Sequence, residues 1–176
     1  MSCNIEVKIK IDDMNGLKKS ILAMGAEESG QMHQIDTFFG GVNRLKLREY
    51  GDQATAELIA YQRPDIADLR TCEYRLCRVS NPDELKETLA FALPLLKTIE
   101  KTRLLFLRGR TRIHLDEVKS LGQFLELEVV LGSEDTTDSG EEEALAILKK
   151  LGLEDAPRIS GSYFDLVDGS DLNEHQ

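Results

Sequence analysis

Seven stretches of the sequence alternate between apolar and polar residues with a period of two, which strongly limits the folds open to the chain. The first is NIEVKIK at residues 4–10, where Ile5, Val7 and Ile9 are separated by polar side chains. This period is typical of a β-strand with one buried face. The other six stretches lie at 44–48, 57–63, 71–75, 101–107, 110–116 and 124–130.

The order of the expected elements favours an antiparallel α+β fold. We expect strands at 4–11, 31–39, 44–50, 55–63, 70–79, 98–107, 111–118 and 123–131, and helices near 14–24, 82–93, 140–151 and 162–167. Asn81 and Ser139 are the expected N-caps of the second and third helices. The order lacks the regular β/α alternation of a doubly wound sheet. We therefore predict an eight-stranded antiparallel β-barrel with helices packed on the outside.

Composition narrows the classes of function. The chain has 176 residues, 41% of them hydrophobic, which suits one domain at 1–167 with a polar acidic tail at 168–176. A formal net charge of −10 disfavours long nucleic acid as a ligand. No run approaches the roughly 20 apolar residues of a membrane helix. Cys3, Cys72 and Cys77 are an odd number of cysteines without metal-like spacing, so we expect reduced thiols and a cytoplasmic protein.

The charged strand faces carry the functional signal. One interpretation is that they face solvent, as in any half-exposed antiparallel sheet. However, the helices need the apolar faces as a surface to pack on, which would turn the charged faces inward around a lumen. The expected lumen cations are Lys8, Lys46, Arg48, Arg63, Lys101, Arg103 and Arg112, and the expected carboxylates are Glu6, Asp116, Glu126 and Glu128.

Two charged sets of this kind suit a two-part ligand. Clustered carboxylates suit a hard divalent cation such as Mg²⁺ or Mn²⁺, which prefers oxygen ligands. Clustered Arg and Lys suit a polyphosphate. A metal ion bound to a phosphate chain would satisfy both sets, which indicates phosphoryl or nucleotidyl transfer.

The sequence also resembles the CYTH family, the triphosphate tunnel metalloenzymes, over roughly residues 5–167. NIEVK is similar to the family's opening Glu-x-Glu-x-Lys, with Asn4 in place of the first Glu. DTFF at 36–39, RLKLRE at 44–49, YQRPD at 61–65 and EKTR at 100–103 resemble further family blocks. The stretch RTRIHLDEVKSLGQFLELE at 110–128 is the most specific and looks like the class IV adenylyl cyclase branch.

The resemblance implies a tunnel that grips a linear triphosphate and holds a divalent metal. By position it assigns all seven lumen cations to the phosphates, and Glu6, Asp116, Glu126 and Glu128 to Mg²⁺ or Mn²⁺. Glu6, Lys8 and Asp116 would act in catalysis. Alternation alone also places Lys10, Glu57 and Arg75 in the lumen. His114 and Tyr61 are weaker candidates for a general base than for structural roles.

Three functions remain open at this point. The first is a hydrolase acting on inorganic or organic triphosphate. The second is a class IV adenylyl cyclase that converts ATP to cyclic AMP and pyrophosphate. The third is a non-catalytic polyphosphate- or nucleotide-binding module. The expected partner is a small triphosphate compound, such as tripolyphosphate, thiamine triphosphate or ATP, and the protein would act as a monomer or homodimer.

Overall fold

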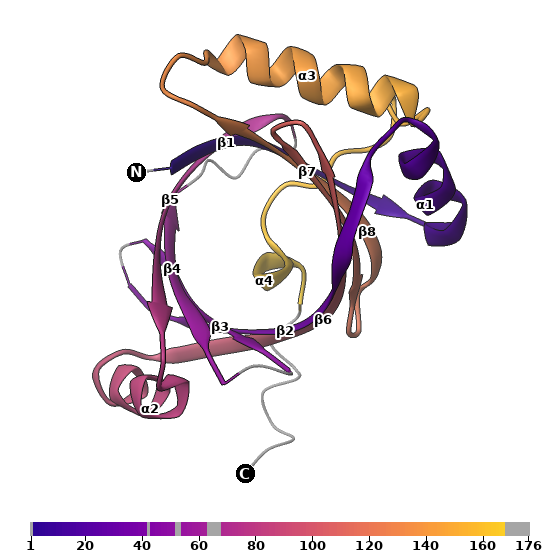
Figure 1. The fold of residues 1–176 in the computed structure, drawn as a ribbon. Coiled ribbons are helices and arrows are strands. Elements are labelled where there is room, and N and C mark those ends of the chain that lie inside the picture. The colour runs from indigo at the N-terminus through magenta and orange to yellow at the C-terminus, as the bar shows by residue number, and fades with distance from the viewer. Residues whose placement is uncertain (1, 42, 52–53, 63–67, 168–176) are drawn as a thin grey trace.

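A computed structural model describes residues 2–41, 43–51, 54–62 and 68–167. In this part of the chain eight antiparallel strands close into a barrel in the order β1-β5-β4-β3-β2-β6-β7-β8 (Figure 1). The strands are β1 (Ser2–Ile11), β2 (Glu27–Phe39), β3 (Arg44–Tyr50), β4 (Ala56–Gln62), β5 (Arg70–Val79), β6 (Leu95–Arg108), β7 (Thr111–Val118) and β8 (Gly122–Leu131). The predicted eight-stranded barrel is confirmed.

Four helices accompany the described strands. They are α1 (Met14–Ala23), α2 (Pro82–Ala92), α3 (Thr137–Lys150) and α4 (Tyr163–Leu166). Viewed along the barrel, α1 and α3 lie outside the ring on one side and α2 outside it on another, whereas α4 lies within the ring (Figure 1). Among the described residues, no helix combines the length and the apolar character needed to cross a bilayer.

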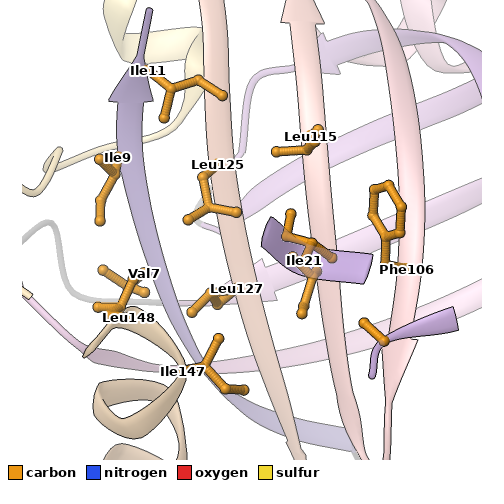
Figure 2. Close-up of a cluster of buried hydrophobic side chains, with 12 residues drawn as sticks. Val7, Ile9, Ile11, Ile21, Phe106, Leu115, Leu125, Leu127, Ile147 and Leu148 are labelled. Carbon is orange, nitrogen blue, oxygen red and sulfur yellow. The ribbon is translucent and has the colours of Figure 1, made fainter. Parts of the chain in front are cut away.

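The main hydrophobic core lies between the outer wall of the barrel and the helices α1 and α3. Figure 2 shows Val7 of β1 beside Leu127 of β8 and close to Ile147 of α3, with Ile9 farther along β1 and Ile21 contributed by α1. All five side chains are buried. Each such aliphatic side chain contributes about 1.5–3 kcal/mol when it leaves water. The odd-numbered residues of β1 therefore face outward into a core, and its even-numbered residues must face inward.

A second core lies under α2. Leu85 and Leu89 of α2 pack against Phe39, Leu47 and Ala56 of the barrel. Both cores use the apolar strand faces, so the charged faces are left for the interior. This arrangement is the one expected from the alternating sequence.

Some element boundaries differ from the prediction. Strand β2 begins at Glu27, well before the predicted residue 31, and a register shift at Gly30, with φ of +138°, interrupts its pairing with β6. Glycine tolerates this φ without a steric cost. Helix α3 is capped by Thr136, whose hydroxyl accepts a hydrogen bond from the backbone N–H of Ser139 at 3.2 Å. The predicted cap at Ser139 is wrong because Ser139 lies in the first helical turn.

Candidate functional site

The inner face of the barrel encloses a cavity of about 350 Å³, a size typical of small-molecule sites. Both predicted charged sets contribute to its wall. The predicted residues that line it are Glu6, Lys8, Lys46, Arg48, Lys101, Arg103, Arg112, Glu126 and Glu128. They come from β1, β3, β6, β7 and β8, so strands that are far apart in the sequence contribute side chains to the same cavity.

Asp36 of β2 organises the cations on one side of the cavity. Arg48 donates two hydrogen bonds to its carboxylate, at 2.7 and 2.8 Å, and Lys46 donates one at 2.8 Å. The Lys101 ammonium lies 3.7 Å away. Burial alone would raise the pKa of Asp36, but Arg48, Lys46 and Lys101 outweigh it and hold the pKa well below its usual range. Asp36 is therefore ionised and keeps three cations together in a buried place.

Arg103 of β6 forms a second buried ionic centre. Its guanidinium donates to both oxygens of Asp116, at 2.7 and 2.6 Å, and to Glu126 at 2.9 Å. Burial would raise the pKa of both carboxyls, yet Arg103 for Asp116, and Lys8 and Arg103 for Glu126, lower it. Both acids are charged, and the pairing fixes the plane of the guanidinium.

The lysine between these two centres is held in an unfavourable environment for its charge. Lys101 is 4% exposed, and burial followed by repulsion from Arg103 lowers its pKa well below the usual value. A phosphate group near Lys101 would favour its protonated form. Lys46, Arg48 and Lys101 share the single carboxylate of Asp36. These cations could therefore accommodate a bound anion that supplies further negative charge.

Three carboxylates form a group that fits a divalent metal. Glu6, Glu126 and Glu128 each place an oxygen within 4.8 Å of the others. Two oxygens on opposite sides of one Mg²⁺ are about 4 Å apart, since each Mg–O distance is roughly 2.0–2.1 Å. Small side-chain adjustments would therefore allow the group to bind one ion. Asp116 is not in this group, and its carboxylate accepts hydrogen bonds from Arg103 and Tyr163.

Arg70 of β5 orients Glu6. Its Nε donates to Glu6 at 2.8 Å, and its terminal nitrogens donate to the backbone carbonyls of Ile159 and Gly161, each at 3.2 Å. Both side chains are nearly inaccessible, at 1% exposure for Arg70 and 7% for Glu6. One guanidinium therefore connects a candidate metal ligand to the segment that leads into α4.

Tyr163, the first residue of α4, lies among the charged side chains. Its hydroxyl donates to Asp116 at 2.7 Å. The ammonium groups of Lys8 and Lys101 lie 3.9 and 5.1 Å from the centre of its ring, within the range of cation–π contacts. Burial, followed by the negative charges of Asp116 and Glu126, raises the pKa of the phenol well above its usual value. Tyr163 is therefore a neutral hydrogen-bond donor.

Several polar atoms on the cavity wall have no hydrogen-bond partner among the described residues, and two of them are Oδ1 of Asn4 and Nδ1 of His114. Both residues are buried, at 3% and 4% exposure. Burial, followed by repulsion from Arg103, lowers the pKa of His114 well below its usual value. A neutral imidazole with a buried unpaired nitrogen is costly, which indicates that a ligand or water satisfies it.

Some predicted lumen residues lie elsewhere. Arg63 lies outside the described residues. Lys10 and Arg75 are exposed and do not line the cavity, so their predicted place in the lumen is wrong. Lys10 is near the end of β1, while Arg75 is on the outer face of β5, because Cys72 and Tyr74 point inward. Glu57 does line the cavity and accepts a hydrogen bond from Tyr50 at 2.7 Å, and burial raises the pKa of Tyr50 to about 12.

Sequence reasoning missed Asp36, Arg70 and Tyr163. Alternation could have identified Asp36, because it lies on the same face of β2 as Gln34 and Phe38, which also point inward. Arg70 shares the parity of Tyr74 but is at the first position of its strand, where alternation is hard to judge. Tyr163 has no periodic signal, since it comes from a four-residue helix.

The CYTH domain family model matches residues 2–163 of the chain. A curated protein from Methanocaldococcus jannaschii named "Putative adenylate cyclase" is 26% identical over 172 residues, which cover 92% of this chain and 97% of that protein.

Solved structures share the fold. A protein from Pyrococcus horikoshii has a TM-score of 0.84 at 20% identity and covers 94% of this chain and 99% of its own. A protein from Hippeastrum, described as a "putative adenylyl cyclase" with a dominant triphosphatase activity, has a TM-score of 0.68 at 14% identity, with 94% of each chain covered.

Proposed function

Because the chain belongs to the CYTH domain family, we propose that it is a divalent-metal-dependent enzyme that hydrolyses inorganic or organic triphosphate inside the barrel. One observation carries the proposal. Buried cations and a group of three carboxylates face the same cavity, which is the composition that a metal–triphosphate complex requires.

The cations would bind the phosphate chain and stabilise the charge of the transferred phosphoryl group. Lys46, Arg48 and Lys101 already converge on Asp36 and line the cavity, so phosphate oxygens can approach them without a large rearrangement. Lys8, Arg103 and Arg112 would contact the phosphate chain from the opposite side of the cavity. We assign Asp116 the role of holding Arg103 in position, in addition to its predicted part in catalysis. Arg63 remains a predicted phosphate ligand.

Glu6, Glu126 and Glu128 would hold Mg²⁺ or Mn²⁺, with Arg70 positioning Glu6. The bound metal would supply Lewis-acid polarisation of a phosphate oxygen. Asp116, the fourth predicted ligand, lies outside this group of three and, like Glu126, pairs with Arg103.

Adenylyl cyclase activity is the second candidate, and it is favoured by the name of the relative from Methanocaldococcus jannaschii. In a cyclase the ribose 3′-oxygen would attack the α-phosphate of ATP and pyrophosphate would leave. The same cations and carboxylates would serve either reaction, because the two differ in which phosphorus meets the nucleophile. The third candidate is a module that binds polyphosphate without turning it over.

The products distinguish these functions. The purified chain is incubated with Mg²⁺ or Mn²⁺ and, separately, with tripolyphosphate, thiamine triphosphate and ATP. Orthophosphate release identifies the hydrolase. Cyclic AMP with pyrophosphate identifies the cyclase, and binding without turnover identifies the module.

A matched pair of variants tests the location of the site. The double variant Lys101→Ala, Arg103→Ala should lose tripolyphosphate binding, whereas Arg75→Ala removes an exposed cation from the outer face and should retain it. Full binding by the double variant would refute a site in the barrel. We assign the activity to a single domain at 1–167 of a cytoplasmic monomer or homodimer. Residue 1 and the tail at 168–176 lie outside the described residues.

A further inference from the structure

Cys72 is a thiol that faces the cavity. It lies on the inner face of β5, between Arg70 and Tyr74, and lines the cavity with only 6% of its surface exposed. Along the same row of inward side chains, Arg70 is 2% exposed and Leu76 is 47% exposed. Cys72 therefore lies between the accessible end of the cavity and its buried ionic interior.

Asn4 of β1 stands directly opposite Cys72 in the pairing of β1 with β5. It also lines the cavity and is 3% exposed, and its Oδ1 has no hydrogen-bond partner among the described residues. A buried carbonyl oxygen without a partner is unfavourable, and a cation is one of the groups that can satisfy it. The unpaired oxygen thus indicates a ligand in this part of the cavity.

The register brings the two donor atoms within reach of one ion. Residues directly opposite each other on antiparallel strands have Cβ atoms about 4.5–5.5 Å apart. Around a tetrahedral Zn²⁺, a sulfur ligand and an oxygen ligand are roughly 3.6 Å apart, since Zn–S is about 2.3 Å and Zn–O about 2.0–2.2 Å. The side chains of Asn4 and Cys72 are short and face the same cavity, so side-chain rotation can bring them to this separation.

Glu6 can supply a third ligand. It follows Asn4 by two residues on the same face of β1, and its partner on β5, Arg70, precedes Cys72 by two residues. Such diagonal neighbours are about 7–8 Å apart, a distance that a long side chain can span. Cys72 lies outside the group of three carboxylates that fits Mg²⁺. An ion at Cys72 would therefore take a second position, which shares Glu6 with that group.

The chemistry of the donors selects the class of ion. A thiolate is a soft ligand that suits Zn²⁺ or Cd²⁺, whereas Mg²⁺ prefers oxygen ligands. Asn4 offers an oxygen without a negative charge, so it adds little to the binding of a hard cation. Three protein ligands with a fourth position left for water form a common arrangement in open zinc sites. These donors therefore favour a thiophilic cation over Mg²⁺.

We propose that Cys72 and Asn4, together with Glu6, form a second cation site that binds Zn²⁺ in preference to Mg²⁺. The thiol of Cys72 releases its proton to water when the ion binds. The site needs no phosphate, so it does not depend on which reaction the protein catalyses. Spacing along the sequence does not reveal it, because its ligands come from two strands and meet only when β1 pairs with β5.

Cadmium absorbance tests the thiolate ligand directly, because a bond between Cd²⁺ and a thiolate gives a charge-transfer band in the ultraviolet. The reduced, metal-free protein is titrated with Cd²⁺ in the absence of phosphate. The double variant Cys3→Ser, Cys77→Ser keeps Cys72 as the only cysteine of the chain and should show the band. The variant Cys72→Ser should not show it. Circular dichroism checks that each variant is folded.

The Zn²⁺ affinity, measured by competition with a coloured chelator, tests both ligands. We expect Cys72→Ser to bind Zn²⁺ at least about tenfold more weakly, a difference of about 1.4 kcal/mol. Asn4→Leu keeps the size of the side chain but removes the oxygen, and should bind Zn²⁺ at least about threefold more weakly. The Mg²⁺ affinity of Cys72→Ser, measured by calorimetry, should stay within about twofold of the unmodified protein, because Mg²⁺ does not use the thiol.

Three results would overturn the proposal. The first is the absence of the band in the double variant, and the second is its persistence in Cys72→Ser, which would place the ion at another cysteine. The third is an unchanged Zn²⁺ affinity in a folded Asn4→Leu variant. If Cys72→Ser does not fold, the double variant still decides, because Cys72 is its only thiol.

Discussion

Arg103 is buried and bound to two carboxylates, so it stabilises the fold in addition to its proposed role as a phosphate ligand. Removing it would leave Asp116 buried without its main counterion, and would leave Glu126 with Lys8 but without its second cation. Loss of one partner from a buried ion pair typically costs about 3–5 kcal/mol.

We therefore predict that Arg103→Met lowers the free energy of unfolding by about 3–5 kcal/mol and also abolishes tripolyphosphate binding. Arg103→Lys should recover part of the stability but not the two-oxygen contact with Asp116. Urea unfolding measures the first effect and calorimetry the second. The control is Arg75→Met, which should change stability by less than about 0.5 kcal/mol. Equal losses in the two methionine variants would contradict the assignment.

Asn4 is the position at which the first strand departs from the family pattern that it resembles. Its Oδ1 has no hydrogen-bond partner among the described residues, and it lines the cavity two residues before Glu6. A carboxylate there would add charge to the acidic group.

We predict that Asn4→Glu raises the affinity for Mn²⁺ roughly tenfold, equivalent to about 1.4 kcal/mol. Without metal the variant should be less stable, because a fourth carboxylate repels the other three. Titration of Mn²⁺ followed by electron paramagnetic resonance measures the affinity. Asn4→Gln lengthens the side chain without adding charge and is the control. An unchanged Mn²⁺ affinity in Asn4→Glu would show that this position does not contribute to metal binding.

At the scale of elements, helix α3 packs unusually close to the barrel. A Cβ atom on Gly140 would lie 2.7 Å from a side-chain atom of Ile5 and 2.8 Å from one of Leu131. Glycine usually weakens a helix by about 0.8–1.0 kcal/mol relative to alanine. Here the close approach outweighs that cost.

Gly140→Ala should therefore destabilise the protein by about 1–3 kcal/mol, the usual effect of overpacking, although alanine is the better helix former. Thermal unfolding measures this. Glu142→Ala, at an exposed position in the same helix, should have little effect. A stabilised Gly140→Ala variant would mean that helix and barrel separate easily.

The individual strands show which parts of the site can be predicted from the sequence. Except for Lys10 at the end of β1, alternation on β1, β3, β6, β7 and β8 correctly separated the outer apolar face from the charged inner face, because one face of each strand is plainly apolar. It failed on β5, where both faces carry polar residues and the position of Arg70 opposite Glu6 decides the orientation. It could not place Tyr163, because that residue reaches the site through tertiary contacts of a short helix.

At the scale of the whole molecule, the buried charges make stability depend on pH. The unfolded chain protonates His114 near pH 6.5, but the folded protein resists this because burial and Arg103 lower the pKa. Below that pH the unfolded state binds more protons and stability falls. The depressed pKa values of Asp36, Asp116 and Glu126 contribute stability that is complete above about pH 4 and is lost below it.

We thus expect the free energy of unfolding to decline in two stages between pH 8 and pH 3. The first begins near pH 6.5 and the second near pH 4. Urea unfolding at a series of pH values resolves them. His114→Gln should remove only the first stage. A constant free energy of unfolding between pH 7 and pH 5 in the unmodified protein would show that His114 is protonated in the folded state.

The pairing of β1 has a consequence for how the chain folds during synthesis. Strand β1 pairs with β5 on one side, where Glu6 lies opposite Arg70, and with β8 on the other, where Glu6 lies opposite Glu128. Because β8 comes more than 100 residues later in the sequence, the ribosome makes β1 long before this second partner. Closing so long a loop costs entropy before any contact repays it, and such non-local pairing makes folding slow. Until β8 arrives, one edge of β1 is open to pairing with other chains. Charged side chains discourage that pairing, so Glu6, Lys8 and Lys10 protect the nascent protein from aggregation before the barrel closes.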